Sequence, residues 1–356
     1  MIREAAFELT LACNARCRHC GSSALHPRKD ELTTKEAIHV IRQLGDIGCD
    51  TLTFSGGEPL MRADWPLLAQ EVHACGLSLG LITNGLLVAE QADTITKSEF
   101  KSVGVSIDGP PDIHDALRGV PGGFTLIMAG LNRIQAAGVR VGVVTQINRL
   151  NRPHLPQLLS ILESIGPSVW QLQLTMPHGR AGKNWKDLAI PVTDLPHLER
   201  EVAELIRRSK INIICADNFG YFGRFEPLFR HGLTQKPTVW SGCRAGLDVI
   251  GICADGGVKG CLSMPDTMIE GNLRKIPLEE MWRSPRHFRY NRHPEQFPLT
   301  GHCATCALGR HCRAGCTSAA MAANGLVTEN PMCIRHQLNE VSTENRSIEN
   351  GHPFSV

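Results

Sequence analysis

The cysteines of this chain fall into two groups, and this grouping restricts the possible folds more than any other feature of the sequence. Three cysteines lie between Cys13 and Cys20, eight lie between Cys243 and Cys333, and three are scattered elsewhere. Fourteen cysteines in 356 residues are fewer than a small disulfide scaffold contains, and a chain of this length does not need such crosslinks. The grouped cysteines therefore predict metal sites.

Composition and charge exclude several classes of protein. Hydrophobic residues make up 42% and charged residues 20% of the chain, which excludes a disordered, collagen-like or membrane protein. The formal net charge of +2 gives no broad basic field, so we expect neither nucleic acid nor a membrane as a partner. The first ten residues carry Arg3, Glu4 and Glu8 where a signal peptide would be apolar, and we expect a cytoplasmic protein.

From residue 5 to about residue 214, the chain repeats a short apolar run, a loop and a segment with helical periodicity. Such alternation predicts parallel strands joined by crossover helices. The expected strands are 4–9, 51–54, 77–82, 102–107, 139–146 and 169–175, and the expected helices are 33–48, 64–75, 88–97, 124–137, 154–165 and 194–209. Thr33 and Glu36 form a capping-box pattern at the first helix. Six such units fit either a partial barrel or an open doubly wound sheet.

After Ile214 this alternation stops, and from Trp240 onward turns, glycine, proline and cysteine dominate. We expect a second domain there, organised around metal rather than around a large apolar core. The segment 218–229 is rich in Phe, Tyr and Gly, and either lines a substrate channel or packs the two domains together. The expected divisions are 1–215, a bridging region 216–239, a cysteine-rich domain 240–340 and a polar tail 341–356.

The first cysteine group forms a C-x3-C-x2-C motif directly after the first expected strand, with Cys13, Cys17 and Cys20 as its members. A structural zinc site normally has four ligands, and no partner pair follows at such a spacing. Three thiolates suit a cubane iron–sulfur cluster with one iron left open. That iron can bind a substrate or cofactor, which a cluster with four cysteine ligands cannot do.

Other polar motifs follow the ends of the expected strands, where barrel enzymes build their sites. Gly56, Gly57 and Glu58 follow the second strand. The two glycines allow the backbone to approach a ligand closely, and Glu58 can order the cysteine loop or bind an ammonium group. The candidates that end strands three to six are Asn84, Ser106, Asp108, Gln146 and His178.

The C-x3-C-x2-C motif followed by Gly56-Gly57-Glu58-Pro59 resembles the radical S-adenosylmethionine (AdoMet) superfamily, over roughly residues 5–215. The resemblance favours a partial (β/α)6 TIM-like barrel within an α/β fold. It implies a catalytic [4Fe-4S] cluster on the three cysteines of the first group, with AdoMet bound to the open iron.

The same resemblance assigns contacts to AdoMet. It implies that Gly56 and Gly57 contact the methionyl amino group, Ser106 the methionyl carboxylate, and residues near Asn84 the ribose. Arg118 is a further candidate for the carboxylate, and His19 takes the usually aromatic position near the adenine. The expected cofactor-binding residues are therefore His19, Gly56, Gly57, Glu58, Asn84, Ser106, Asp108, Arg118 and Gln146.

The second cysteine group has the pattern C-x12-G-x4-C, then C-x2-C-x5-C-x3-C and a final cysteine. Over about residues 240–335 it resembles the SPASM extension of radical AdoMet enzymes, which holds two auxiliary iron–sulfur clusters. The resemblance assigns Cys303, Cys306, Cys312 and Cys333 to one cluster. It assigns Cys243, Cys261 and Cys316 to the other.

This chain departs from the SPASM pattern at two positions. Some members carry a further cysteine where this chain has Val249. The fourth ligand of the Cys243 cluster is therefore Asp248 or Cys253, or the cluster has no fourth protein ligand and one iron is open. Sulfatase-maturing members carry Asp where this chain has Leu262, which disfavours that subfamily. The scattered cysteines Cys49, Cys75 and Cys215 lie on apolar faces, and we expect them to be small core residues.

By resemblance, the reduced first cluster splits AdoMet into methionine and a 5'-deoxyadenosyl radical, which abstracts hydrogen from the substrate. The electron comes from an external low-potential donor such as flavodoxin or ferredoxin. An auxiliary cluster then takes an electron from the substrate radical or holds the substrate. A simple electron carrier or a zinc-dependent interaction module does not explain the three-cysteine site beside Gly-Gly-Glu-Pro.

The substrate is the least determined part. Most proteins of this architecture modify ribosomally made peptides by crosslinking, thioether formation or epimerisation, and we favour this function. The alternative is a small molecule, such as a tetrapyrrole side chain or a sugar. Because the cysteine loop begins at Cys13, we expect no leader-binding domain before it.

Overall fold

A computed structural model describes residues 1–230 and 239–339 of the chain. The polar tail expected at 341–356 lies outside the described residues, as does 231–238 of the expected bridging region.

In the described part of the chain, ten strands form one sheet, ordered β10-β9-β8-β1-β2-β3-β4-β5-β6-β7. Neighbouring strands from β1 to β7 are parallel, as the alternation predicts. Their bounds are β1 (Glu4–Thr10), β2 (Thr51–Gly56), β3 (Ser78–Thr83), β4 (Ser102–Ser106), β5 (Val141–Ile147), β6 (Val169–Leu174) and β7 (Ile213–Cys215). This sheet of parallel strands with intervening helices confirms the predicted α/β fold class.

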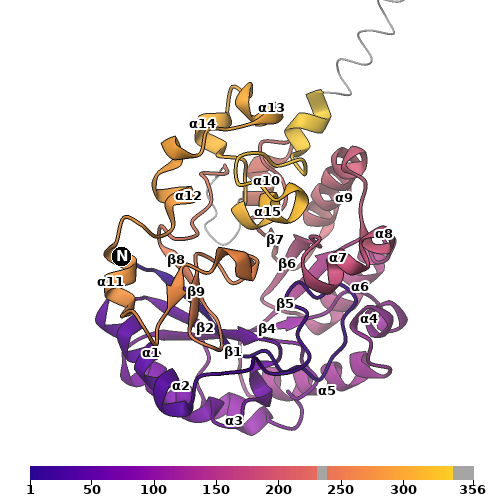
Figure 1. Cartoon of the computed structure of the whole chain (residues 1–356). Helices are drawn as coiled ribbons and strands as arrows, with labels where there is room; N and C mark the ends of the chain where they lie inside the picture. The colour runs from indigo at the N-terminus through magenta and orange to yellow at the C-terminus, as the bar shows by residue number, and fades with distance from the viewer. Residues whose placement is uncertain (231–238, 340–356) are drawn as a thin grey trace, which may run out of the picture.

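Helices lie along the outer side of these strands (Figure 1). They are α1 (Thr34–Asp46), α2 (Trp65–Ala74), α3 (Ala92–Lys97), α4 (Pro111–Arg118), α5 (Gly123–Ala136), α6 (Leu155–Ile165), α7 (Gly179–Lys183), α8 (Trp185–Leu188) and α9 (Leu195–Arg208). Short 3-10 turns are η1 (Pro59–Met61), η2 (Arg152–His154) and η3 (Val192–Asp194). The predicted helices are present, whereas α4, α7, α8 and the short strand β7 were not predicted.

Helix α1 illustrates how the sequence positions these elements. The hydroxyl of Thr33 accepts a hydrogen bond from the backbone N–H of Glu36, whose carboxylate accepts one from the N–H of Thr33. This is the predicted capping box, and it satisfies two helix N-terminal donors. The apolar residues of α1 recur on one face, which is buried against the sheet core.

The cysteine-rich segment continues the same sheet. Strand β8 (Val249–Ile252) pairs in parallel with β1, and β9 (Gly257–Lys259) and β10 (Gly271–Asn272) follow in antiparallel order. Ile250 and Ile252 belong to the core that β1 also contributes to. The expectation of a domain without a large apolar core is therefore wrong for this part, because β8 buries its side chains against the barrel. We propose that the segments before and after residue 240 differ in function although they share one hydrophobic core.

The remaining helices are α10 (Glu226–Arg230), α11 (Leu278–Arg283), α12 (Arg289–Arg292), α13 (Gly301–Ala304), α14 (Gly309–Cys312) and α15 (Thr317–Asn324), with 3-10 turns η5 (Asp266–Met268) and η6 (Pro294–Gln296). Figure 1 shows α13, α14 and α15 grouped at one end of the sheet, beside α10. Among the described residues, no helix is long and apolar enough to span a membrane.

The aromatic residues of the bridging region are packed inside the protein. Phe219, Tyr221 and Phe229 are buried, and the Phe219 and Phe229 rings stack. The hydroxyl of Tyr221 accepts a hydrogen bond of 3.1 Å from the backbone N–H of Cys316. These contacts favour the second of the two predicted roles, in which this region packs the barrel against the cysteine-rich segment instead of lining a substrate channel.

Candidate functional site

The first cysteine loop leaves the end of β1 and packs tightly against the glycines that end β2. The N–H of Gly57 donates to the carbonyl of Thr10, and the N–H of Glu58 donates to that of Ala12, both at 2.8 Å. A Cβ atom at position 57 would lie 2.2 Å from the oxygen of Ala12. The two glycines thus allow β2 to hold the chain that leads into Cys13.

Glu58 connects this loop to the end of β3. Its buried carboxylate accepts hydrogen bonds of 2.7 Å from the Thr83 hydroxyl and from the backbone N–H of Asn84. Burial raises the pKa of Glu58 from 4.5 to about 7. The side-chain amide of Asn84 donates to Asn14 at 2.7 Å and lies 3.7 Å from the sulfur of Cys13. This geometry fits the loop-ordering role expected for Glu58.

Asp108 links Arg118 and His19 behind the cysteine loop. Burial alone would raise the pKa of Asp108, but Arg118 and His19 beside it lower that pKa well below its usual range. Arg118 donates to Asp108 at 2.6 Å and has its other nitrogen 3.8 Å from the sulfur of Cys17. The guanidinium of Arg118, expected to face the AdoMet carboxylate, therefore has two partners within the protein.

His19 is buried at the edge of the cavity described below. Its Nε2 atom lies 3.1 Å from Asp108, but neither ring nitrogen has a well-aligned hydrogen-bond partner among the described residues. A buried polar atom without a partner is costly, so a ligand that bonds to the ring would relieve this cost. The position fits the adenine-side residue implied by the resemblance.

The three thiols of the first group suit the expected cluster. Burial raises the pKa of Cys13 to about 11 and also raises the pKa of Cys17. Cationic iron would reverse this effect, because it stabilises the thiolate form. Among the described residues, no three Cys, His, Asp or Glu side chains converge on a site for a single metal ion. In a cluster each thiolate binds its own iron, so such convergence is not required.

Within the second cysteine group, each of the two expected sets has members that interact with one another. Cys243, Cys261 and Cys316 adjoin one another, and the thiol of Cys316 hydrogen-bonds to Cys243 and lowers the pKa of Cys243 to about 6. The other set is also close enough to interact electrostatically, and burial raises the pKa of Cys312 to about 12 and that of Cys333 to about 11. The members of this set are Cys303, Cys306, Cys312 and Cys333.

The contacts of both fourth-ligand candidates are with other groups. Both carboxylate oxygens of Asp248 accept hydrogen bonds from Arg244, at 2.8 and 3.0 Å. Cys253 is fully buried, and the charged groups that act on it are Lys259, Glu8, Arg28 and Asp266 rather than the other cysteines. We therefore propose that the Cys243 set has three protein ligands and an open iron.

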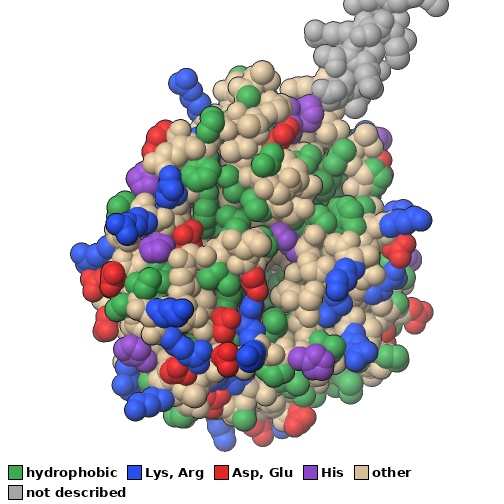
Figure 2. Space-filling view, viewed as in Figure 1, with side chains coloured by type: hydrophobic (Ala, Val, Ile, Leu, Met, Phe, Trp, Pro, Cys, Tyr) green, Lys and Arg blue, Asp and Glu red, His purple; other side chains and the backbone are tan. Residues whose placement is uncertain are grey.

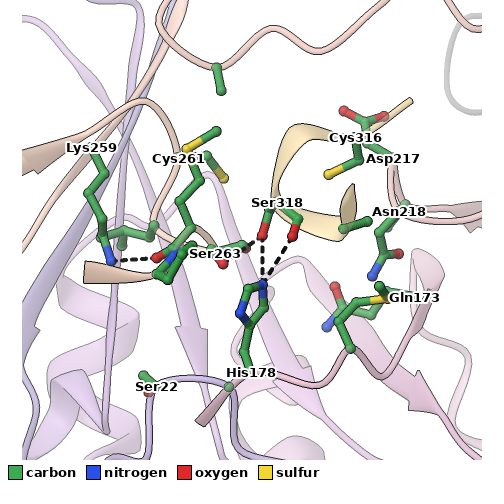
Figure 3. Close-up of a pocket in the computed structure, with 18 of the residues that line it drawn as sticks. Ser22, Gln173, His178, Asp217, Asn218, Lys259, Cys261, Ser263, Cys316 and Ser318 are labelled. Atoms are coloured by element: carbon green, nitrogen blue, oxygen red, sulfur yellow. Dashed lines mark hydrogen bonds between the residues drawn. The ribbon is translucent and has the colours of Figure 1, made fainter. Parts of the chain in front are cut away.

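A cavity of about 870 Å³ lies between the loop that carries the first cysteine group and part of the second group. On one side it is lined by His19, Gly21, Ser55 and Gly56, and on the other by Cys243, Cys261 and Cys316. Figure 3 shows Cys261, Cys316 and His178 around this space, which opens onto the face seen in Figure 2. Of the expected AdoMet contacts, those that line the cavity are His19, Gly56 and Gln146, whereas Gly57, Glu58, Asn84, Ser106, Asp108 and Arg118 stand behind its wall.

The loop after β6 ties the two sides of the cavity together. The backbone N–H of Arg180 donates to the carbonyl of Cys20 at 2.9 Å. His178 contacts the carbonyl of Ser318, two residues after Cys316, through Nε2 at 3.1 Å. Because a carbonyl only accepts, the ring donates from Nε2 and keeps the lone pair of Nδ1.

Sequence reasoning missed three basic residues of the cavity, Arg28, Arg244 and Lys259. Lys259 lies two positions before Cys261, a spacing that places both side chains on the same face of an extended chain. That signal was present in the sequence. Arg28 lies in a loop and reaches the cavity through tertiary packing, which no local pattern indicates.

Comparisons with known proteins agree with this architecture. Residues 7–156 match the radical SAM superfamily model and residues 243–307 match an iron–sulfur cluster-binding domain, SPASM. An "AdoMet-dependent heme synthase" from Methanosarcina barkeri is 31% identical over 341 residues, 92% of this chain and 95% of that protein. A "Mycofactocin maturase MftC" from Mycobacterium tuberculosis is 28% identical over 320 residues, 88% of this chain and 78% of that protein.

A solved structure has the same fold. Streptococcus suis SuiB, "bound to precursor peptide SuiA", matches with a TM-score of 0.70 at 15% identity, covering 93% of this chain and 75% of that chain. At that identity the likeness concerns the fold alone.

Proposed function

Because the chain belongs to the radical SAM superfamily and carries an iron–sulfur SPASM domain, we propose that it oxidises a carboxylate-bearing side chain of a tetrapyrrole. That it is an AdoMet-dependent iron–sulfur enzyme follows from the family. The observation that carries the proposal is one cavity lined both by His19 and Gly21 of the first cysteine loop and by Cys243, Cys261 and Cys316. A substrate in this space meets the AdoMet side and the Cys243 set at once.

We propose that Cys13, Cys17 and Cys20 hold the cluster that binds AdoMet, and that the second group holds two auxiliary clusters. When bound, the first cluster and AdoMet supply a carbon-centred radical that removes a hydrogen atom from the substrate. The residues of the chain position the reactants. The glycines of β2 and the carboxylate of Glu58 fix the cysteine loop.

The Cys243 set suits an oxidation because of where it lies. Hydrogen abstraction leaves a substrate radical, and loss of one further electron completes a two-electron oxidation. Cys243, Cys261 and Cys316 line the same cavity, so an electron acceptor held there is adjacent to the substrate. His178 fixes the distance between the two sides through its bond to Ser318.

The substrate class rests on the relatives and on cavity charge. The match to the heme synthase covers almost the whole length of both proteins, and a relative named "Pre-heme d1 synthase" is 29% identical over 85% of this chain. Arg28, Arg244 and Lys259 line the cavity together with Glu8, Asp217 and Asp266, and the basic groups are of the kind that binds carboxylates. Sequence reasoning favoured a peptide and kept a small molecule, such as a tetrapyrrole side chain or a sugar, as the alternative. We propose the tetrapyrrole first, and the relatives support this order.

A ribosomally made peptide is the second candidate, and one observation favours it. Gln146, Gln171, Gln173 and Asn218 line the cavity, and Figure 3 shows Gln173 and Asn218 on the side opposite Lys259. Primary amides both donate and accept hydrogen bonds, so such a wall suits a peptide backbone. The 28% identity to the mycofactocin maturase is consistent with it.

Anaerobic turnover distinguishes the two. Iron-loaded protein is incubated with AdoMet, a chemical reductant and iron coproporphyrin III, a tetrapyrrole with four carboxylate side chains, and the products are measured by mass spectrometry. The proposal predicts a tetrapyrrole product that does not form with Cys13→Ala. A change in mass of a co-expressed precursor peptide, with the tetrapyrrole unchanged, would instead support the second candidate.

A further inference from the structure

A buried lysine and a partly buried arginine line the cavity and share a carboxylate partner. Lys259, on β9, is 3% exposed, and its ammonium group donates to the carbonyl of Met264 at 2.8 Å and to Asp266 at 3.1 Å. The side chain of Arg28 is 13% exposed and donates to Asp266 at 2.8 Å and to Glu8 at 2.5 Å. All four charged residues line the cavity.

The two carboxylates that neutralise this pair differ in their surroundings. Glu8 is buried on β1, where it also accepts a hydrogen bond from the backbone N–H of Ala254. Asp266 begins the turn η5, and its side chain is 54% exposed. A further carboxylate, Asp255, reaches Arg28 only at 4.0 Å. Glu8 is therefore a fixed partner, and Asp266 is the partner that solvent already reaches.

Removing Asp266 from this position would leave an excess of positive charge in the cavity. The charges of Arg28 and Glu8 balance each other, so the ammonium group of Lys259 would lack an anion. A buried cation without a partner is costly, whereas an exposed carboxylate that rotates into water loses little. Another carboxylate of the same geometry would bind there in place of Asp266.

Arg28 and Lys259 lie in the cavity, where a bound substrate can reach them. Lys259 is two residues from Cys261, and Figure 3 shows its side chain extending along the same wall of the cavity. In Figure 2, acidic and basic side chains lie next to one another below the hollow of this face. A carboxylate held by Arg28 and Lys259 would anchor its carrier between the two cysteine groups.

We propose that Arg28 and Lys259 are the binding site for a carboxylate of the substrate, and that Asp266 occupies this site until the substrate displaces it. The inference rests on the proposed function, since it names the groups that select a substrate with anionic side chains. Asp266 then competes with the substrate carboxylate for this site, and Lys259 attracts the substrate carboxylate. Charge-neutralising substitutions at these two positions must have opposite effects on affinity.

The test is equilibrium binding of iron coproporphyrin III to the full-length, iron-loaded protein, followed by porphyrin absorbance. Its tetra-amide, which keeps the macrocycle and lacks the carboxylate charges, is the matched ligand. The variants are Lys259→Met, Lys259→Arg and Asp266→Asn. Glu279→Gln, which neutralises an exposed carboxylate on α11, is the control for net charge. All are compared at equal iron content.

We expect Lys259→Met to weaken binding of the acid by about tenfold or more, because the variant loses a charge-assisted hydrogen bond to the carboxylate. Lys259→Arg should restore most of this loss. Asp266→Asn should tighten binding of the acid, and neither neutral substitution should alter binding of the tetra-amide.

The outcomes separate the inference from the proposed function. If the macrocycle binds but Asp266→Asn weakens the acid or leaves it unchanged, the basic pair is only structural and the inference is overturned. If neither ligand binds to the unmodified protein, the tetrapyrrole substrate and the inference fall together. The Asp266→Asn result stands even where Lys259→Met fails to fold, because Asp266 is partly exposed.

Discussion

The contact between Gly57 and the cysteine loop gives the sharpest prediction about the first cluster. In Gly57→Ala the new methyl group would lie 2.2 Å from the oxygen of Ala12 and 2.5 Å from that of Leu11, whereas ordinary contact begins at 3.4 Å. Both atoms belong to the backbone, so no side chain can rotate away. The segment that leads into Cys13 must move by about 1 Å, and a misplacement of that size costs about 100-fold in rate.

The assay is reductive formation of 5'-deoxyadenosine from AdoMet, together with iron content and the change in the cluster's electron paramagnetic resonance spectrum on adding AdoMet. We expect Gly57→Ala to lose about 100-fold or more in rate and most of the AdoMet-dependent spectral change. Its auxiliary-cluster signals should remain, because those cysteines lie across the cavity.

Gly21→Ala is the matched control. Gly21 follows Cys20, and a Cβ atom there would lie 3.6 Å from the Cβ of His178, an ordinary contact. Its rate should stay within about threefold of the unmodified protein. A Gly57→Ala protein as active as Gly21→Ala would refute the steric reasoning.

Three further predictions concern other residues. Asp248→Ala and Cys253→Ala should each leave iron content and the auxiliary-cluster spectra unchanged. The reason is that Asp248 is bound by Arg244, and the groups that act on Cys253 are Lys259, Glu8, Arg28 and Asp266. A changed spectrum in either variant would identify a fourth ligand. Burial raises the pKa of Glu58 from 4.5 to about 7, so the folded protein holds the carboxyl proton of Glu58 to a higher pH than the unfolded chain does. This proton stabilises the folded state fully below about pH 4.5, and the stabilisation is lost as the pH rises through 7. Glu58→Gln should remove this dependence, about 3 kcal/mol at most, which thermal unfolding between about pH 5 and 8 measures; an unchanged slope would contradict the assignment. His178→Phe loses the hydrogen bond to Ser318 and should destabilise the protein by about 1 kcal/mol. It should also lower the amount of product formed for each 5'-deoxyadenosine released. If that ratio equals the ratio of the unmodified protein, His178 has no positioning role.

The regular part of the fold was predictable because its signals are local. Strands β1 to β6 are short apolar runs, and α1 carries both a capping box and a one-sided apolar face. Helix α4 was missed because it has only eight residues and begins with a proline, which reads as a turn although the first helical turn tolerates it. The pairing of β8 with β1 joins positions more than 240 residues apart, and no local pattern encodes it.

The candidate site shows the same division. The cysteine motifs and the glycines after β2 are contiguous in sequence, so their chemistry can be read directly. The partners of Arg118 could not be predicted, because Asp108 and Cys17 come from different segments and meet only after folding. Arg28, Lys259 and Asp266 also meet only in the folded chain.

The most direct test of the account is the origin of the hydrogen atom that 5'-deoxyadenosine gains. Iron coproporphyrin III deuterated in its carboxylate-bearing side chains is incubated anaerobically with AdoMet, reductant and the iron-loaded protein, and the 5'-deoxyadenosine is analysed by mass spectrometry. We predict transfer of deuterium into 5'-deoxyadenosine, with matching loss from the tetrapyrrole, and no transfer with Cys13→Ala. Undeuterated 5'-deoxyadenosine beside an unaltered tetrapyrrole would contradict the proposal that this cavity oxidises a tetrapyrrole side chain.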